Sequence, residues 1–222
     1  MKVYEQVIEQ IRNSIIDGTL KKGDKLPTER DLAVQLGVSR TSVREALRAL
    51  EVIGLVESRH GGGNYIRENL ENSLFEPLSM MFILEESKPE DILELRKIIE
   101  VETAGLAAKR INDEQLEKIK ELVDNMKRTS DVHDNAAFDR EFHYSIARAS
   151  GNLLVISILN VISNLMSKFI KEARGMIVSS EENWRMLNNQ HEYILEALSR
   201  HDADAAGLAM RKHFEIVEQY YR

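Results

Sequence analysis

The segment that most constrains the fold of this chain is residues 24–67, where two helical patterns flank a tight turn and a short hairpin follows. Gly37 stands where the first helix must end with positive φ, and Ser39 is placed to cap the second helix. The second helix has one apolar face, made at helical spacing by Val43, Ala46, Leu47, Leu50 and Ile53. After Gly54, the strand-like stretches LVESR and NYIR flank the turn HGGG. The sequence therefore predicts a helix-turn-helix with a β-wing, a unit that presents its second helix to the DNA major groove.

The beginning of the second helix carries side chains that suit DNA. Two arginines and two hydroxyls stand there, Arg40, Arg44, Thr41 and Ser42, and no acid precedes Glu45. A wing tip of one histidine and three glycines lets the backbone approach a groove wall closely. The alternative is a plain pair of helices beside a hairpin, with the arginines as ordinary solvated charges. The combined pattern favours DNA binding.

Residues 26–66, LPTERDLAVQLGVSRTSVREALRALEVIGLVESRHGGGNYI, resemble the winged helix of the GntR family of bacterial transcription regulators. The resemblance extends over nearly all of residues 1–67. It implies DNA contacts from a set of residues that are all present here, namely Arg30, Arg40, Thr41, Ser42, Arg44, His60 and Gly61. Because one winged helix reaches only a short half-site, we expect a homodimer on a palindromic, double-stranded operator.

A net charge of −7 over 222 residues argues against DNA binding only when it is averaged over the chain. Residues 1–67 hold 11 Lys and Arg against 9 Asp and Glu, a net charge of +2, whereas residues 68–222 carry −9. The arginines of the second helix can attract DNA locally, while the acidic part repels it from other surfaces.

Cysteine is absent, which excludes disulfides and thiolate chemistry. No stretch reaches the length of an uncharged membrane span, and the charged N-terminal residues do not form a signal segment. We therefore expect a cytoplasmic protein without membrane contacts.

The predicted fold is mainly α, with a winged helix-turn-helix over residues 1–67, a polar linker over 68–73 and an all-α bundle over 74–222. Helical patterns cover 2–17, 89–109, 112–127, 136–151, 152–175, 180–200 and 202–222, with a loop at 128–135. Along 89–109 the residues expected to face inward are Ile92, Leu95, Ile98, Ile99, Ala104 and Leu106. We find no strand pattern beyond residue 67.

Three histidines near the apolar sides of their helices form a candidate metal site. Asp139 and His143 are four residues apart and so share one helix face. His191 and His213 lie beside apolar residues on the last two predicted helices. A bundle core can collect such ligands, and a carboxylate with imidazoles suits zinc, nickel, manganese or iron. The alternative is a set of core histidines with one hydrogen bond each, since these spacings match no compact metal motif.

Residues 92–218 resemble the FCD type of effector domain, which accompanies this winged helix in the FadR branch of the GntR family. The segments FDREFHYSIARASGN and HEYILEALSRHDADAAGLAMRKH carry the resemblance. It implies a divalent metal ion bound by Asp139, His143, His191 and His213, and effectors that are small organic acids.

The same resemblance implies that an arginine of the first long helix of this domain binds the effector, and in ILELRKIIEVETAG that residue is Arg96. A guanidinium suits a carboxylate because it can donate two parallel hydrogen bonds. The alternative for Arg96 is a surface ion pair with Glu100, four residues further along the helix.

Four functions are compatible with this set of residues. The first is a transcription regulator, expected to repress, that responds to a small carboxylate at the metal. The second senses the metal itself, the third is a metal-dependent hydrolase, and the fourth is a metal-free regulator with structural histidines. No general base is evident beyond the candidate ligands, so the sequence favours a DNA-binding regulator that is not an enzyme.

Overall fold

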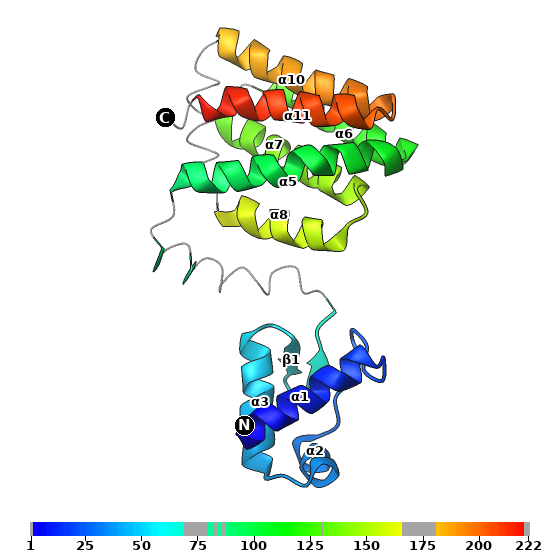
Figure 1. Ribbon diagram of the computed structural model, residues 1–222, viewed down its shortest axis with the longest axis vertical. Coiled ribbons are helices and arrows are strands. Elements are labelled where there is room, and N and C mark those ends of the chain that lie inside the picture. The colour runs from blue at the N-terminus through cyan, green and yellow to red at the C-terminus, as the bar shows by residue number, and fades with distance from the viewer. Residues whose placement is uncertain are drawn as a thin grey trace. The chain divides into compact units, whose positions relative to one another are not determined.

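The computed structural model describes residues 2–68, 80–81, 84–85, 88–129, 131–165 and 181–219. It divides the chain into two compact units, Met1–Glu76 and Pro77–Arg222, which we call the winged-helix unit and the helical unit (Figure 1). Each unit has a hydrophobic core of its own. Of the linker predicted at 68–73, only Glu68 lies among the described residues.

The winged-helix unit has the predicted elements in the predicted order. They are α1 (Val3–Ile16), α2 (Glu29–Leu36), α3 (Arg40–Val52), β1 (Val56–Arg59) and β2 (Gly63–Ile66). The strands form an antiparallel pair in which Val56 is opposite Ile66 and Arg59 is opposite Gly63. The wing is therefore a short hairpin that directly follows the second helix of the helix-turn-helix.

The turn between α2 and α3 is built by the residues that the sequence assigns to it. Gly37 ends α2 with φ of +64°, a left-handed conformation that glycine adopts without strain. The Ser39 side chain caps α3 by accepting a hydrogen bond from the Ser42 N–H at 3.1 Å. The Thr28 hydroxyl caps α2 in the same way, accepting from the Asp31 N–H at 3.2 Å. These caps fix where α2 and α3 begin, because each satisfies a backbone N–H that has no partner within its helix.

The helical unit consists, among the described residues, of helices only. They are α5 (Pro89–Arg110), α6 (Asp113–Arg128), α7 (Val132–Ala149), α8 (Leu153–Leu165), α10 (Glu181–Ser199) and α11 (Ala203–Glu218). Helix α11 packs between α5 and α10, and α7 packs against α5, α6 and α8 (Figure 1). The mainly α fold class is thus confirmed.

Two sequence predictions about helix boundaries need comment. The loop predicted over 128–135 is wrong in its second half, because α7 already begins at Val132. The Asp131 carboxylate caps this helix by accepting hydrogen bonds from the backbone of His133 and Asp134 at 2.8 and 3.0 Å. The helix predicted over 152–175 is described only as far as Leu165, and the rest lies outside the described residues.

The prediction of which residues of α5 face the core is wrong at two positions. Leu95 and Ile98, expected in the core, are 37% and 61% exposed. Arg96 and Glu100 are buried instead, at 4% and 2%. The buried face of α5 is set by Leu93, Val101, Ala104 and Ala108, which belong to the hydrophobic core, and Arg96 and Glu100 lie on that same face, where Glu100 meets His143.

Helices α5 and α11 touch through their backbones. A Cβ on Gly105 would lie 3.2 Å from the Ala203 carbonyl oxygen, and one on Gly207 would lie 3.4 Å from the Val101 carbonyl oxygen. The two helices run antiparallel, because Val101 meets Gly207 while Lys97 pairs with Glu218 at 2.9 Å. A Cβ at Gly105 would require the Ala203 carbonyl to shift by a few tenths of an ångström, whereas one at Gly207 would be in van der Waals contact with Val101.

Candidate metal centre and nucleic-acid interface

The N-terminal end of α3 is an exposed cationic surface. Arg40, Thr41 and Arg44 are exposed there, and no acidic residue stands in the first turn of the helix. Ser42 is partly buried, and its hydroxyl lies 2.9 Å from that of Ser39. Arg30, on α2, is also exposed. The residues that the family resemblance assigns to DNA contact are therefore on the surface, apart from the half-buried Ser42.

One of these arginines already has a partner that the sequence reasoning did not include. The Arg44 guanidinium meets the Glu29 carboxylate, with Nη2 at 2.7 Å from Oε2 and Nε at 3.1 Å from both oxygens. The hydrogen bond from Arg44 lowers the pKa of Glu29, and the bond to Glu29 raises the pKa of Arg44. Glu29 precedes Arg30 in the sequence, but its pairing depends on how α2 crosses α3, which no local pattern reveals.

The wing presents its tip to solvent. His60 and Gly61 are both exposed, and Gly61 has φ of +70°, which a residue with a side chain would adopt only with strain. Behind the tip, the Arg59 guanidinium lies over the Tyr65 ring at 4.2 Å and pairs with Glu57 at 2.6 Å. The hairpin therefore keeps a stiff base under an exposed, glycine-rich tip.

The helical unit buries the four residues of the candidate metal site together. Asp139 and His143 come from α7, His191 from α10 and His213 from α11. One ligand atom from each of the four lies within 4.8 Å of those of the others, and all four residues are buried. We call this set the Asp-His cluster.

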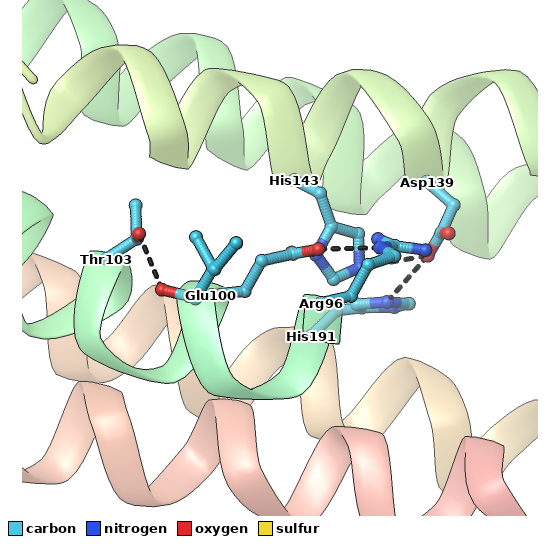
Figure 2. Close-up of polar contacts among 7 residues, drawn as sticks. Arg96, Glu100, Thr103, Asp139, His143 and His191 are labelled. Atoms are coloured by element: carbon cyan, nitrogen blue, oxygen red, sulfur yellow. Dashed lines mark hydrogen bonds and ion pairs between the residues drawn. The ribbon is translucent and has the colours of Figure 1, made fainter. Parts of the chain in front are cut away.

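The geometry of the Asp-His cluster centres on the aspartate. His191 Nε2 lies 3.1 Å from Asp139 Oδ1, and His143 Nε2 lies 3.7 Å from the same oxygen (Figure 2). The His213 ring completes the group, with its centroid 5.0 Å from that of His143 and 4.9 Å from that of His191. Three helices thus direct one carboxylate and three imidazoles toward one point.

This donor set fits a divalent metal ion. Neutral imidazoles and one carboxylate are ordinary ligands of first-row metals, and four protein ligands leave a position open for a further molecule when the metal takes five or six ligands. The aromatic rings of Phe142 and Phe214 border the cluster, with Phe142 edge-on to His191 at 4.9 Å. The cluster could therefore hold a metal in a closed, apolar setting.

Arg96 and Glu100 lie beside the cluster rather than at the surface. Arg96 Nε donates to Glu100 Oε1 at 2.7 Å, and Glu100 Oε2 contacts His143 Nδ1 (Figure 2). Burial by itself raises the pKa of the Glu100 carboxyl, but the positive charge of Arg96 and the hydrogen bonds from Arg96 and His143 outweigh it, so the pKa is lowered. The ion pair considered from the sequence does form, but it is buried, and Glu100 is a site residue that the sequence reasoning missed.

A groove of about 560 Å³ on the outside of α5 and α11 lies apart from this site. Its lining includes four carboxylates and two basic side chains, and none of its lining residues belongs to the Asp-His cluster. A small anion would meet net negative charge there. The groove is therefore not a competing site for an organic acid.

A winged helix with an exposed arginine surface, in one chain with a helical unit that buries a cluster of potential metal ligands, is typical of a DNA-binding transcription regulator with a separate effector domain. Comparison with known families supports this class on both units. Residues 3–66 match the model of bacterial regulatory proteins of the gntR family, and residues 91–216 match the FCD domain. The chain belongs to the GntR family of transcription regulators, in the FadR branch that carries an FCD domain.

Similar proteins extend over almost the whole chain. The HTH-type transcriptional regulator LutR of Bacillus subtilis is 34% identical over 208 residues, covering 92% of this chain and 94% of LutR. The putative L-lactate dehydrogenase operon regulatory protein of Escherichia coli is 34% identical over 221 residues, covering 97% and 85%. The structure of a Streptococcus agalactiae GntR protein superposes with a TM-score of 0.67 at 28% identity, covering 97% and 99%. These relatives are regulators, as predicted for this chain.

The described residues contain no helix that is both long and apolar enough to cross a membrane.

Proposed function

We propose that this regulator is a homodimeric repressor whose binding to a palindromic operator is controlled by a short hydroxycarboxylate, such as L-lactate, bound at a divalent metal ion. Asp139, His143, His191 and His213 would hold the metal, and Arg96 would bind the carboxylate. The observation that carries the proposal is the buried Asp-His cluster with an arginine next to it.

The electrostatics of the cluster favour an anion. One carboxylate and three neutral imidazoles leave a divalent ion with net positive charge in a buried place. Arg96 adds a second positive group, although Glu100 balances it in part. A small carboxylate would lose its water more readily there than in an apolar pocket.

The choice of a hydroxycarboxylate comes from chemistry and from the relatives together. A hydroxyl next to a carboxylate offers two oxygens to a metal and still leaves one for a guanidinium. The Escherichia coli relative is described as a putative regulator of the L-lactate dehydrogenase operon, which makes L-lactate the first compound to test.

The proposed DNA interface consists of Arg30, Arg40, Thr41, Ser42, Arg44, His60 and Gly61. Two such interfaces related by twofold symmetry would read the halves of a palindrome. The effector would act by binding one arrangement of the helical units better than another, and a coupling of about 1–3 kcal/mol is typical of such regulation.

The test combines thermal unfolding with operator binding on the full chain. Metal-free protein is loaded with Zn²⁺, Mn²⁺, Ni²⁺ or Fe²⁺, and each form is mixed with L-lactate or with propionate, which lacks the hydroxyl. We expect the metal to raise the melting temperature, because a ligand of the folded state stabilises it by mass action. L-lactate should raise it further and change operator affinity, whereas propionate should do so less.

Three variants identify the site. His191→Ala should lose metal binding and the response to L-lactate, whereas His133→Ala, an exposed histidine of α7, should keep both. Arg96→Lys keeps a positive charge near Glu100 but loses the planar fork, so it should bind metal and weaken L-lactate binding. If metal alone changes operator affinity and L-lactate adds nothing, the protein is a metal sensor. If His191→Ala responds like the wild type, the effector site lies elsewhere.

A further inference from the structure

Glu100 is not one of the four residues of the Asp-His cluster, but its carboxylate contacts two charged or polar side chains beside that cluster. It is 2% exposed, and its two carboxylate oxygens face different partners on different helices. Oε1 accepts from Arg96 Nε on its own helix at 2.7 Å, and Oε2 contacts His143 Nδ1 on α7 (Figure 2). We propose that Glu100 is a positioning residue for the metal site, which sets the tautomer and orientation of His143. This inference rests on the proposed metal-binding function.

The two nitrogens of His143 face opposite ways. Nδ1 contacts the Glu100 carboxylate, and Nε2 points to Asp139, 3.7 Å from its Oδ1. An ionised carboxylate only accepts hydrogen bonds, so the neutral imidazole must carry its proton on Nδ1 to pair with it. The Nε2 lone pair is then directed into the Asp-His cluster, where a metal would need it.

Glu100 is also fixed in place itself. Arg96 donates to its other oxygen, and the Arg96 guanidinium lies 5.5 Å from the centre of the Phe214 ring, next to His213 in the sequence. The carboxylate therefore cannot rotate away from His143 without losing a buried ion pair. One charged group thereby connects the arginine proposed for the effector with a histidine proposed for the metal.

A purely structural ion pair is the competing explanation, and Glu100→Gln separates the two. The amide has the same shape, but its oxygen is the only group that can accept from Arg96. Its NH₂ group then faces His143 and donates to Nδ1, which moves the imidazole proton to Nε2. A protonated Nε2 opposes a metal, so the substitution acts on metal binding beyond any effect on packing.

The experiment measures the dissociation constant of Zn²⁺ for the full chain by competition with a chromophoric chelator. We expect Glu100→Gln to weaken Zn²⁺ binding by about 10–100-fold, the usual effect of losing a carboxylate behind a ligating histidine. The visible spectrum of the Co²⁺-loaded protein should change as well, because one nitrogen ligand is weakened. The matched control is Thr103→Val, a buried and isosteric change on the same helix that removes only a bond to the Ile99 carbonyl.

A second variant keeps the test decisive if the amide prevents folding. Glu100→Asp retains the negative charge beside Arg96 but withdraws it from His143, so Zn²⁺ binding should still weaken while Thr103→Val binds like the wild type. Wild-type affinity and an unchanged Co²⁺ spectrum in a folded Glu100 variant would overturn the positioning role. If the wild type itself binds no metal, the proposed function fails, and that outcome is recognised before any variant is compared.

Discussion

The winged-helix unit and the helical unit differ in whether charged side chains are buried. Among the described residues, every buried polar or charged side chain lies in the helical unit, and the core of the winged-helix unit is entirely apolar. The arginines of α2 and α3 in the winged-helix unit are exposed, whereas Arg96 is 4% exposed and has a buried partner. Arginines are proposed to bind DNA in the winged-helix unit and the effector in the helical unit, but only the helical unit has an arginine in its core.

This difference shows how the size of the target determines the placement of the recognition groups. DNA is a large polyanion that must be met from outside, so its contacts remain at the surface and cost the fold little. A small anion offers few contacts and is held firmly only when water is excluded. The buried charges of the helical unit are then compensated by one another, which makes that core sensitive to the loss of a single partner.

The largest expected effect comes from removing Arg96. Arg96→Met leaves the Glu100 carboxylate buried with its charge less compensated, and it should destabilise the helical unit by about 3–5 kcal/mol. Urea unfolding of the metal-free full chain measures this change. The control is Arg200→Met, which breaks an ion pair of the same i, i+4 spacing to Glu196 in which both side chains are 58% exposed. Equal destabilisation by the two substitutions would contradict the claim that the buried ion pair matters more for stability than the exposed one.

Substitutions in α3 of the winged-helix unit should have effects of intermediate size, on operator affinity rather than on the stability of the fold. Arg40→Ala and Arg44→Ala should each lower operator affinity by roughly 10- to 100-fold and reduce discrimination against a scrambled duplex, because base contacts are lost. Fluorescence anisotropy with both duplexes measures this, and urea unfolding should change little, because both arginines are exposed. Arg12→Ala is the control, since it removes an exposed arginine from α1. Full operator affinity in both α3 variants would contradict the assignment.

The smallest effect should come from Glu29. Glu29→Gln removes an ion pair whose side chains are 51% (Arg44) and 27% (Glu29) exposed, so the folding equilibrium at neutral pH should change by less than a factor of about two. The pKa of Glu29 is lowered in the folded state, so its pairing stabilises the fold above the ordinary carboxyl pKa and is lost as the pH falls through the lowered value. Urea unfolding from neutral pH down to roughly 3 should bring variant and wild type together. A difference that grows on acidification would contradict this sign.

The winged-helix unit could be predicted from the sequence almost element by element, because its signals are local. A glycine at a helix end, a serine cap and an alternating hairpin each act over a few residues, and the predicted cap at Ser39 is confirmed. The pairing of Arg44 with Glu29 joins residues 15 apart on two helices, and nothing in either helix specifies it.

In the helical unit the sequence indicated the four residues of the Asp-His cluster, but not their surroundings. The i, i+4 spacing of Asp139 with His143 indicated a shared face, and the structure brings His191 and His213 to it. The spacing of Arg96 with Glu100 was visible too, yet it suggested a surface pair, because burying two charges is unfavourable until a third group compensates them. That third group, His143, lies 43 residues away from Glu100, so only the fold shows that Leu95 and Ile98 face outward.

Helices α5 and α11 are in close backbone contact at Gly105 and Gly207, so a change in their crossing angle would move the helix ends more than it moves this contact. Arg96 lies nine residues before Gly105, about 13 Å along the helix axis, and His213 lies on the same side of the crossing. A change of 10° in the crossing angle would therefore displace the Arg96 end of α5 by roughly 2 Å, while the contact at the glycines stays closed. If L-lactate binds as proposed, between Arg96 on α5 and His213 on α11, a ligand of that size would be enough to shift the two helices relative to one another.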